Sequence, residues 1–182
     1  MGEKTGNVNM FSEKRREEKE RKRAEKEIEK FVKRAEREKN RENYVRAVAL
    51  YQNAARTAKS IGDKRAVDFC MEAANCASKL GDDFRTGWSY KCAADYSLIF
   101  GDCNNALNFG MKAVKHFMKT DSLYIVQWCY NVMGRAAEKM KNYELAIKNY
   151  KKSLEIEHSE EIDKKLKEIL KRMEKKKPEK KV

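Results

Sequence analysis

Apolar residues between positions 42 and 158 recur at steps of three and four, the spacing that places side chains on one face of an α-helix. Short turn signals interrupt this pattern about every twenty residues: Ile61-Gly62-Asp63, Leu80-Gly81-Asp82, Phe100-Gly101-Asp102, Thr120-Asp121-Ser122, Lys141-Asn142 and His158-Ser159. Glycine after an apolar run favours a helix end, and a following Asp or Ser caps the next helix. The pattern therefore predicts six helices in which consecutive helices are antiparallel neighbours.

These predicted helices repeat with a period of 40 residues. Small residues share one register at Ala66, Ala106 and Ala146, and seven residues later at Ala73, Ala113 and Ser153. Small side chains at these positions let a neighbouring helix approach closely, and stacked helical hairpins bury a continuous core from about three repeats upward. We therefore expect an all-α fold, an α-solenoid of three antiparallel helical hairpins over residues 42 to 158.

Segments of different character flank this array. Residues 12 to 41 alternate in charge and predict a charged helix whose last part docks on the array as a cap. The apolar stripe that would dock consists of Ile28, Phe31, Val32 and Ala35. Residues 159 to 174 predict a C-terminal capping helix, whereas residues 1 to 11 and the basic tail 175 to 182 are expected to be disordered.

The third predicted hairpin resembles a tetratricopeptide repeat. The hairpin reads Tyr130-x-x-Met133-Gly134-x-x-Ala137 and then Tyr143-x-x-Ala146-x-x-x-Tyr150-x-x-Ser153. Gly134, Tyr143, Ala146 and Tyr150 fit the repeat, and Ala137 stands in place of its usual tyrosine. The longer period and longer helices are similar to the soluble NSF-attachment proteins (SNAPs), above all over residues 43 to 55 and the stretch Glu72-Ala73-Ala74-Asn75. This resemblance extends over roughly residues 28 to 157.

The resemblance implies a non-enzymatic adaptor. SNAP proteins lay a basic, curved helical face on an acidic four-helix SNARE bundle and recruit a hexameric ATPase. This chain has a basic run around Lys175 where those proteins carry an acidic C-terminal element, so we do not expect recruitment of the ATPase. The expected partner is another protein, a peptide or an acidic helical surface, in a vesicle-trafficking-like or complex-assembly role.

The charge of the chain leaves a second function open. Lysine and arginine number 42 against 29 aspartate and glutamate, a formal net charge of +13 that favours polyanionic partners. The run from Lys164 to Lys181 is rich in basic residues and free of aromatic ones, as in segments that bind nucleic acid or anionic membrane without sequence preference. The alternative is therefore a nucleic-acid-associated helical protein that uses its basic termini.

Motifs of catalysis, metal binding and membrane insertion do not occur in the sequence. It has no phosphate-binding glycine loop, nucleophile elbow or zinc-protease motif, so we expect no catalytic residues, no cofactor and no small-molecule substrate. The five cysteines form no C-x-x-C pair, and His116 and His158 stand away from them, so we expect reduced thiols and no metal. Without a signal peptide or membrane span, we expect a cytoplasmic monomer or weak homo-oligomer.

Two tryptophans in one repeat register mark the candidate binding site. Trp88 and Trp128 lie 40 residues apart on the first helix of each pair, which by the tetratricopeptide resemblance faces the concave groove. Helical spacing places further residues on that face: Lys91, Asp95 and Leu98 with Trp88, then Asn131, Arg135, Glu138 and Lys139 with Trp128, and as first-repeat counterparts Val48, Tyr51, Ala55 and Lys59. Among them, the predicted binding residues are Lys91, Asn131, Arg135 and Lys139. Aromatic anchors beside such donors suit a peptide carboxylate or an acidic side chain. The other interpretation is that both rings are packed in the core.

Overall fold

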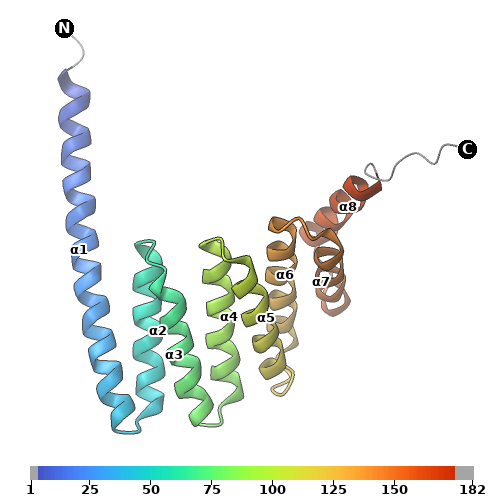
Figure 1. Cartoon of the computed structure of the whole chain (residues 1–182), viewed down its shortest axis with the longest axis horizontal. Coiled ribbons are helices and arrows are strands. Elements are labelled where there is room, and N and C mark those ends of the chain that lie inside the picture. The colour runs from blue at the N-terminus through green and yellow to red at the C-terminus, as the bar shows by residue number, and fades with distance from the viewer. Residues whose placement is uncertain (1–3, 175–182) are drawn as a thin grey trace, which may run out of the picture.

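The computed structural model describes residues 4–174, with side chains from residue 13 onward. Within this part the chain is all-helical and contains no strand, so the expected all-α class is confirmed there. The eight helices are α1 (Lys4–Asn40), α2 (Tyr44–Ser60), α3 (Arg65–Lys79), α4 (Asp83–Ile99), α5 (Cys103–Phe117), α6 (Leu123–Lys139), α7 (Tyr143–Ile156) and α8 (Glu160–Glu174). Figure 1 shows them side by side in chain order from α1 to α8, as in an α-solenoid.

The first helix is longer than the sequence predicted. α1 begins at Lys4, so residues 4 to 11, which were expected to be disordered, belong to the helix, and residues 1 to 3 lie outside the described part. A formed helix extends easily at its end, because each added residue gains a backbone hydrogen bond without a new nucleation step. In Figure 1 the N-terminal part of α1 runs well past the ends of the neighbouring helices.

The turns between the helices have the glycine conformations and the aspartate caps that the sequence predicts. Gly62, Gly81 and Gly101 have φ angles of 73°, 67° and 83°, the left-handed conformation that ends a helix. Asp82 and Asp102 then cap α4 and α5, each carboxylate accepting a hydrogen bond from a backbone N–H three residues later. These local signals explain why the six predicted helices begin and end close to the bounds of α2 to α7.

The core is built from small side chains at the helix contacts. Ala66, Ala106 and Ala146 are fully buried, which confirms the prediction that this register faces the interior. At Gly134 the contact is closer still, because a Cβ atom there would lie 2.5 Å from the ring of Tyr150. Each helix packs against the next one along the chain, so the core runs through the stack as a series of linked clusters.

Helices two apart in the chain also meet. α4 contacts α6, and the Lys139 ammonium donates a hydrogen bond of 3.3 Å to the carbonyl of Leu98 across this contact. Between α2 and α4 the Gln52 amide lies 3.4 Å from the Ser89 hydroxyl. The even-numbered helices α2, α4 and α6 are therefore neighbours on one side of the stack.

The two end helices dock through apolar stripes. α1 buries Ile28 and Ala35 against α2 and α3, and α8 buries Ile162, Leu166 and Ile169 in a cluster with α7. Among the helices described, none combines the length and the apolar character that a membrane crossing requires.

Candidate functional site

Both tryptophans lie at the surface of neighbouring even-numbered helices. Trp88 of α4 is 38% exposed and Trp128 of α6 is 44% exposed. The interpretation that both rings are packed in the core is therefore wrong. Exposed tryptophan is costly in water and is enriched at protein interfaces, where its large ring is covered by a partner.

A lysine connects the two rings. The Lys91 ammonium lies 5.0 Å from the ring centroid of Trp88 and 5.1 Å from that of Trp128. Both distances are within the range of cation–π attraction. Asp95, one turn further along α4, lies 3.0 Å from the same ammonium and accepts a hydrogen bond of 3.2 Å from the Trp128 indole. Four side chains from two helices thus hold one another in place.

Two more exposed aromatic residues extend this surface. Phe84 stacks on Trp88 with ring centroids 6.4 Å apart, and Tyr124 stands one helical turn before Trp128. Phe84 and Tyr124 are both exposed, and they are themselves 40 residues apart. We call the surface formed by Phe84, Trp88, Tyr124 and Trp128 the tryptophan face.

Phe84 and Tyr124 were not predicted as site residues, although the sequence contains a signal for them. An aromatic residue four positions before each tryptophan repeats in the same register, and such a pair shares one helix face. Asp95 was considered on this face but was not among the predicted site residues. Its importance follows from the indole hydrogen bond, which only the packing of α6 against α4 creates.

A hollow of about 420 Å³ adjoins the tryptophan face between α2 and α4. It is lined mainly by apolar groups, from Val45, Val48, Ala49, Gln52, Phe84, Arg85 and Trp88. The Arg85 guanidinium pairs with the Asp82 carboxylate at the start of α4. The hollow therefore offers an apolar side chain of a partner a place next to the exposed rings.

The remaining predicted residues do not join the four-residue cluster. The Lys139 ammonium donates a hydrogen bond to the carbonyl oxygen of Leu98. Arg135 is exposed, and its positive charge interacts with the Glu161 carboxylate of α8. Asn131 is half-buried, and its Oδ1 atom is buried without a hydrogen-bond partner among the described residues. Of the six predicted residues, the structure thus brings together Trp88, Lys91 and Trp128.

The expected counterparts in the first repeat are not part of this surface. The register placed four residues on the same face: Val48, Tyr51, Ala55 and Lys59. The first three are buried, and Lys59 is exposed in the last turn of α2. Val48 and Tyr51 belong to a cluster to which α1 contributes Ala35, so the long first helix helps to cover this part of α2. The tryptophan face therefore belongs to α4 and α6, with α2 contributing the wall of the hollow.

The cysteines nearest the cluster are not reactive groups. Burial raises the pKa of the Cys92 thiol to about 11 and that of the Cys129 thiol to about 12. Thiols with such pKa values stay protonated near neutral pH, and the thiolate is the nucleophile. All five cysteines are free, as the sequence predicts. Across the described side chains, no group of three or more His, Cys, Asp or Glu residues is arranged to hold a metal ion.

His116 has a structural environment. Its Nδ1 atom lies 2.6 Å from the Asp83 carboxylate, and its ring stacks on Tyr90 at a centroid distance of 5.7 Å. Together with the Lys119 ammonium, this hydrogen bond lowers the pKa of the Asp83 carboxyl group. The contact links the start of α4 to the end of α5.

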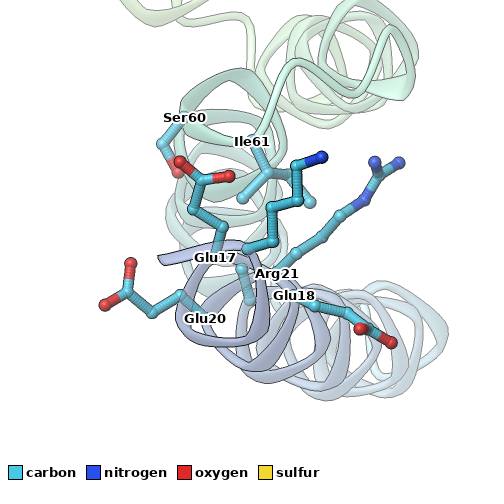
Figure 2. A pocket seen from close by; sticks show the side chains of 8 residues that line it. Glu17, Glu18, Glu20, Arg21, Ser60 and Ile61 are labelled. Atoms are coloured by element: carbon cyan, nitrogen blue, oxygen red, sulfur yellow. The ribbon is translucent and has the colours of Figure 1, made fainter. Parts of the chain in front are cut away.

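A wider hollow of about 660 Å³ lies where α1 passes the end of α2, but its chemistry is diffuse. Figure 2 shows the Glu17 side chain extending toward Ser60, whereas the carboxylates of Glu18 and Glu20 point in different directions. The charged side chains here are exposed, and Glu18 pairs with Lys22 along its own helix. The hollow has no converging set of groups of the kind that binds a ligand.

Comparison with known proteins gives no family assignment. No protein-family model matches the sequence, and no curated protein matches it either.

Proposed function

We propose that the chain is a non-enzymatic adaptor that binds another protein through the tryptophan face. The observation that carries this proposal is the Lys91 ammonium held between the rings of Trp88 and Trp128. Large aromatic groups that are already fixed lose little conformational freedom when a partner covers them. An exposed cluster of this kind matches the aromatic anchors that dominate the binding energy of protein interfaces.

The partner that fits this surface has an apolar anchor and carboxylates. An apolar side chain fills the hollow between α2 and α4 beside Trp88. Lys91 is already paired with Asp95, so its charge serves to hold the rings and not to attract the partner. Arg56 of α2 and Arg135 of α6 are both exposed, and neither guanidinium lies within ion-pair distance of a carboxylate in residues 13–174. These two arginines are left to bind acidic groups of the partner.

The proposed architecture is three stacked hairpins, α2 with α3, α4 with α5 and α6 with α7. The 40-residue register supports this pairing, because the fully buried alanines at 66, 106 and 146 each stand near the start of the second helix of a pair. The pairing is that of tetratricopeptide-like repeats with long helices, similar to SNAP proteins. A role in complex assembly or vesicle trafficking follows as part of this proposal.

The alternative function, association with nucleic acid, has less support in the described part of the chain. In α8, Lys165 pairs with Glu161 and Lys167 pairs with Asp163. The basic run is thus partly neutralised by its own helix, whereas proteins that bind phosphates present a continuous row of free cations. Its last part, residues 175–182, lies outside the described residues.

The adaptor proposal is tested by affinity capture from cell extract with the full chain as bait. We expect the double variant Trp88→Ala/Trp128→Ala and the variant Arg135→Glu to lose a partner that the unchanged chain retains. Leu170→Ala and Arg46→Glu are matched controls, since both residues are exposed and lie outside the tryptophan face.

The controls should capture the same partner as the unchanged chain. Capture that is unaffected by removing both tryptophans would contradict the proposed site. Capture only of nucleic acid, with retention falling steeply as salt is raised, would favour the alternative function instead.

A further inference from the structure

A separate hollow lies between α5 and α7, with α6 as its floor. Its volume is about 280 Å³. It is lined by Leu107, Met111, Val114, Tyr130, Met133, Leu145, Lys148, Asn149 and Lys152. We call it the α5/α7 slot. Met111 on its edge is 60% exposed, an unusual position for a long apolar side chain that has no neighbour to cover it.

The preceding repeat shows how the same place is closed by an aromatic ring. Tyr90 of α4 stacks on Phe109 of α5 with ring centroids 6.4 Å apart and an angle of 17° between the planes. Lys112 lies over both rings, 5.4 Å and 5.8 Å from their centroids. Phe109 is buried in a cluster with partly buried residues of α3, so the ring fills the space between α3 and α5.

Forty residues later the tyrosine and the lysine recur, but the phenylalanine does not. Tyr130 and Lys152 stand in the registers of Tyr90 and Lys112, and the Lys152 ammonium lies 5.1 Å from the Tyr130 ring centroid. The register of Phe109 is occupied by Asn149.

The Asn149 side chain does not replace the missing ring. Its amide donates a hydrogen bond of 2.9 Å to the Leu145 carbonyl of its own helix, so it turns back along α7. The space that a phenylalanine ring fills in the second repeat is therefore open as the α5/α7 slot in the third. The slot combines an aromatic floor, an aliphatic wall and a cation above the ring plane.

The charge around the slot selects among possible occupants. Lys148 and Lys152 line it, no acidic residue does, and neither ammonium lies within ion-pair distance of a carboxylate among residues 13–174. The basic C-terminal segment around Lys175 to Lys177 carries charge of the same sign, which disfavours it as an occupant. An apolar group flanked by carboxylates is complementary in both respects.

We propose that the α5/α7 slot binds a phenylalanine side chain of a partner peptide whose neighbouring residues are acidic. The ring stacks on Tyr130 beneath Lys152, as Phe109 does on Tyr90 beneath Lys112. The flanking carboxylates pair with Lys148 and Lys152. This site lies on α5 and α7, whereas the tryptophan face lies on α4 and α6, and it does not depend on the function proposed for that face.

The test uses two methionine methyl groups that line the slot. The full chain is labelled with ¹³C at its methionine methyl groups and titrated with the peptide acetyl-Glu-Asp-Phe-Asp-Glu-amide. We expect the NMR signals of Met111 and Met133 to shift with increasing peptide, while those of Met71 and Met173, outside the slot, stay in place. The same peptide with alanine for phenylalanine should produce no shift. Equal shifts with both peptides, or none, would overturn the proposal.

Variants of the protein distinguish the slot from other binding. Asn149→Phe supplies the ring from the chain itself, so the peptide-induced shifts should disappear while the helical circular dichroism is unchanged. If Asn149→Phe does not fold, the double variant Lys148→Glu/Lys152→Glu decides, because both changes lie at the rim. We expect it to bind the peptide about tenfold more weakly or worse.

A matched control carries the same charge change elsewhere. Lys33→Glu/Lys59→Glu alters two exposed lysines of α1 and α2 and should keep the affinity of the unchanged chain. Equal weakening by both double variants would mean that the peptide responds only to net charge, and would overturn the proposal. If the Met111 NMR signal shifts with protein concentration in the absence of peptide, a second copy of the chain occupies the slot. That result would also overturn the proposal.

Discussion

At the scale of single residues, Lys91 is the side chain on which the candidate site depends. Its ammonium is shared by two indole rings and the Asp95 carboxylate, and its side chain is only 18% exposed. Each such contact is worth roughly 0.5 to 1 kcal/mol at a partly exposed site, and the values are not additive. The lysine therefore fixes the rings more than it provides free charge.

Replacing Lys91 tests this role. We expect Lys91→Met, which keeps the length of the side chain, to lower the free energy of unfolding by about 1 kcal/mol, because it removes the cation between the rings. Urea denaturation followed by circular dichroism measures the change. The control Lys59→Met alters an exposed lysine of α2 and should stay within about 0.5 kcal/mol of the unchanged chain. Equal effects at both positions would contradict the account.

The cap of α4 leads to a prediction on pH. Asp82 accepts a hydrogen bond of 2.8 Å from the backbone N–H of Arg85, and this bond lowers the pKa of its carboxyl group. A carboxyl group whose pKa is lowered on folding stabilises the fold above its ordinary value, near about 3.9, and this contribution is lost as pH falls through the lowered pKa.

Two substitutions of Asp82 separate the cap from the charge. Asp82→Ala should cost about 1 kcal/mol of unfolding free energy near about pH 7, because the α4 cap is lost. Asp82→Asn keeps a capping oxygen, as Asn142 does for α7. Urea denaturation measures the free energy of unfolding of the unchanged chain and of Asp82→Asn. We expect the difference between the two to shrink as the pH falls from about 4 toward about 2. A constant difference across that range would be inconsistent with the lowered pKa.

Residue environments could be predicted from the sequence only where the register alone decides them. The burial of Ala66 follows from its register, and the same holds for its two equivalents. Val48 and Trp88 share one register, yet Val48 is buried and Trp88 is exposed. The difference arises in part because α1 lies against α2, and no comparable long helix covers α4. Pairing of Lys91 with both rings likewise depends on the distance between two helices, which no local pattern encodes.

At the scale of helices, glycine sets how closely α6 approaches its neighbours. A Cβ atom at Gly134 would lie 2.5 Å from the Tyr150 ring, and one at Gly110 would lie 2.6 Å from the Cγ atom of Met133. The Tyr150 ring is fully buried and its hydroxyl donates a hydrogen bond to the Glu138 carboxylate, so the ring has no room to move. Met133 is flexible and borders the α5/α7 slot, so it has space to shift.

These two glycines should therefore respond differently to alanine. We expect Gly134→Ala to lower the free energy of unfolding by about 1 to 3 kcal/mol through overpacking. Gly110→Ala should cost less, because Met133 moves aside and alanine gains up to about 1 kcal/mol in helix propensity. Urea denaturation of both variants measures the difference, and a larger loss at Gly110 would contradict the tighter packing at Gly134.

The long first helix combines a docked part with a part exposed to solvent. Ile28 is buried in a cluster with Ala58 and Ala66, whereas Glu18 and Lys22 pair with each other on the exposed part of α1. We expect Ile28→Ala to cost about 2 to 5 kcal/mol of unfolding free energy. Replacing both Glu18 and Lys22 with alanine should change it by less than about 0.5 kcal/mol, because exposed ion pairs contribute little.

A comparable loss from the two sets of substitutions would mean that the exposed part of α1 also stabilises the stack. Thermal and urea unfolding of the same variants measure this directly.

The docked stripe of α1 could be predicted from the sequence, because Ile28 and Ala35 stand at helical spacing, but the start of the helix could not. Helix ends at a chain terminus carry weak signals, because extension there depends on backbone hydrogen bonding more than on side-chain pattern.

At the scale of the whole molecule, the order of the stack could be predicted because its causes are local. Turn glycines, capping aspartates and buried alanines act over a few residues, and short turns force each helix against the next. The binding surface could be predicted only in part. Trp88 and Trp128 were found by their register, whereas Asn131 is half-buried and the Lys139 ammonium is hydrogen-bonded to a carbonyl of α4. Those outcomes depend on how far each helix is rotated within the stack.

Photo-crosslinking in cell extract tests whether a partner protein covers the tryptophan face. A benzophenone amino acid replaces Tyr124, which is exposed on this face, and in a parallel sample replaces Met118 at the end of α5. We expect position 124 to yield a defined crosslinked protein that is absent from position 118 and is lost when Trp88 and Trp128 are both alanine. A crosslink at position 124 that persists without the two rings, or the same product from both positions, would contradict the account.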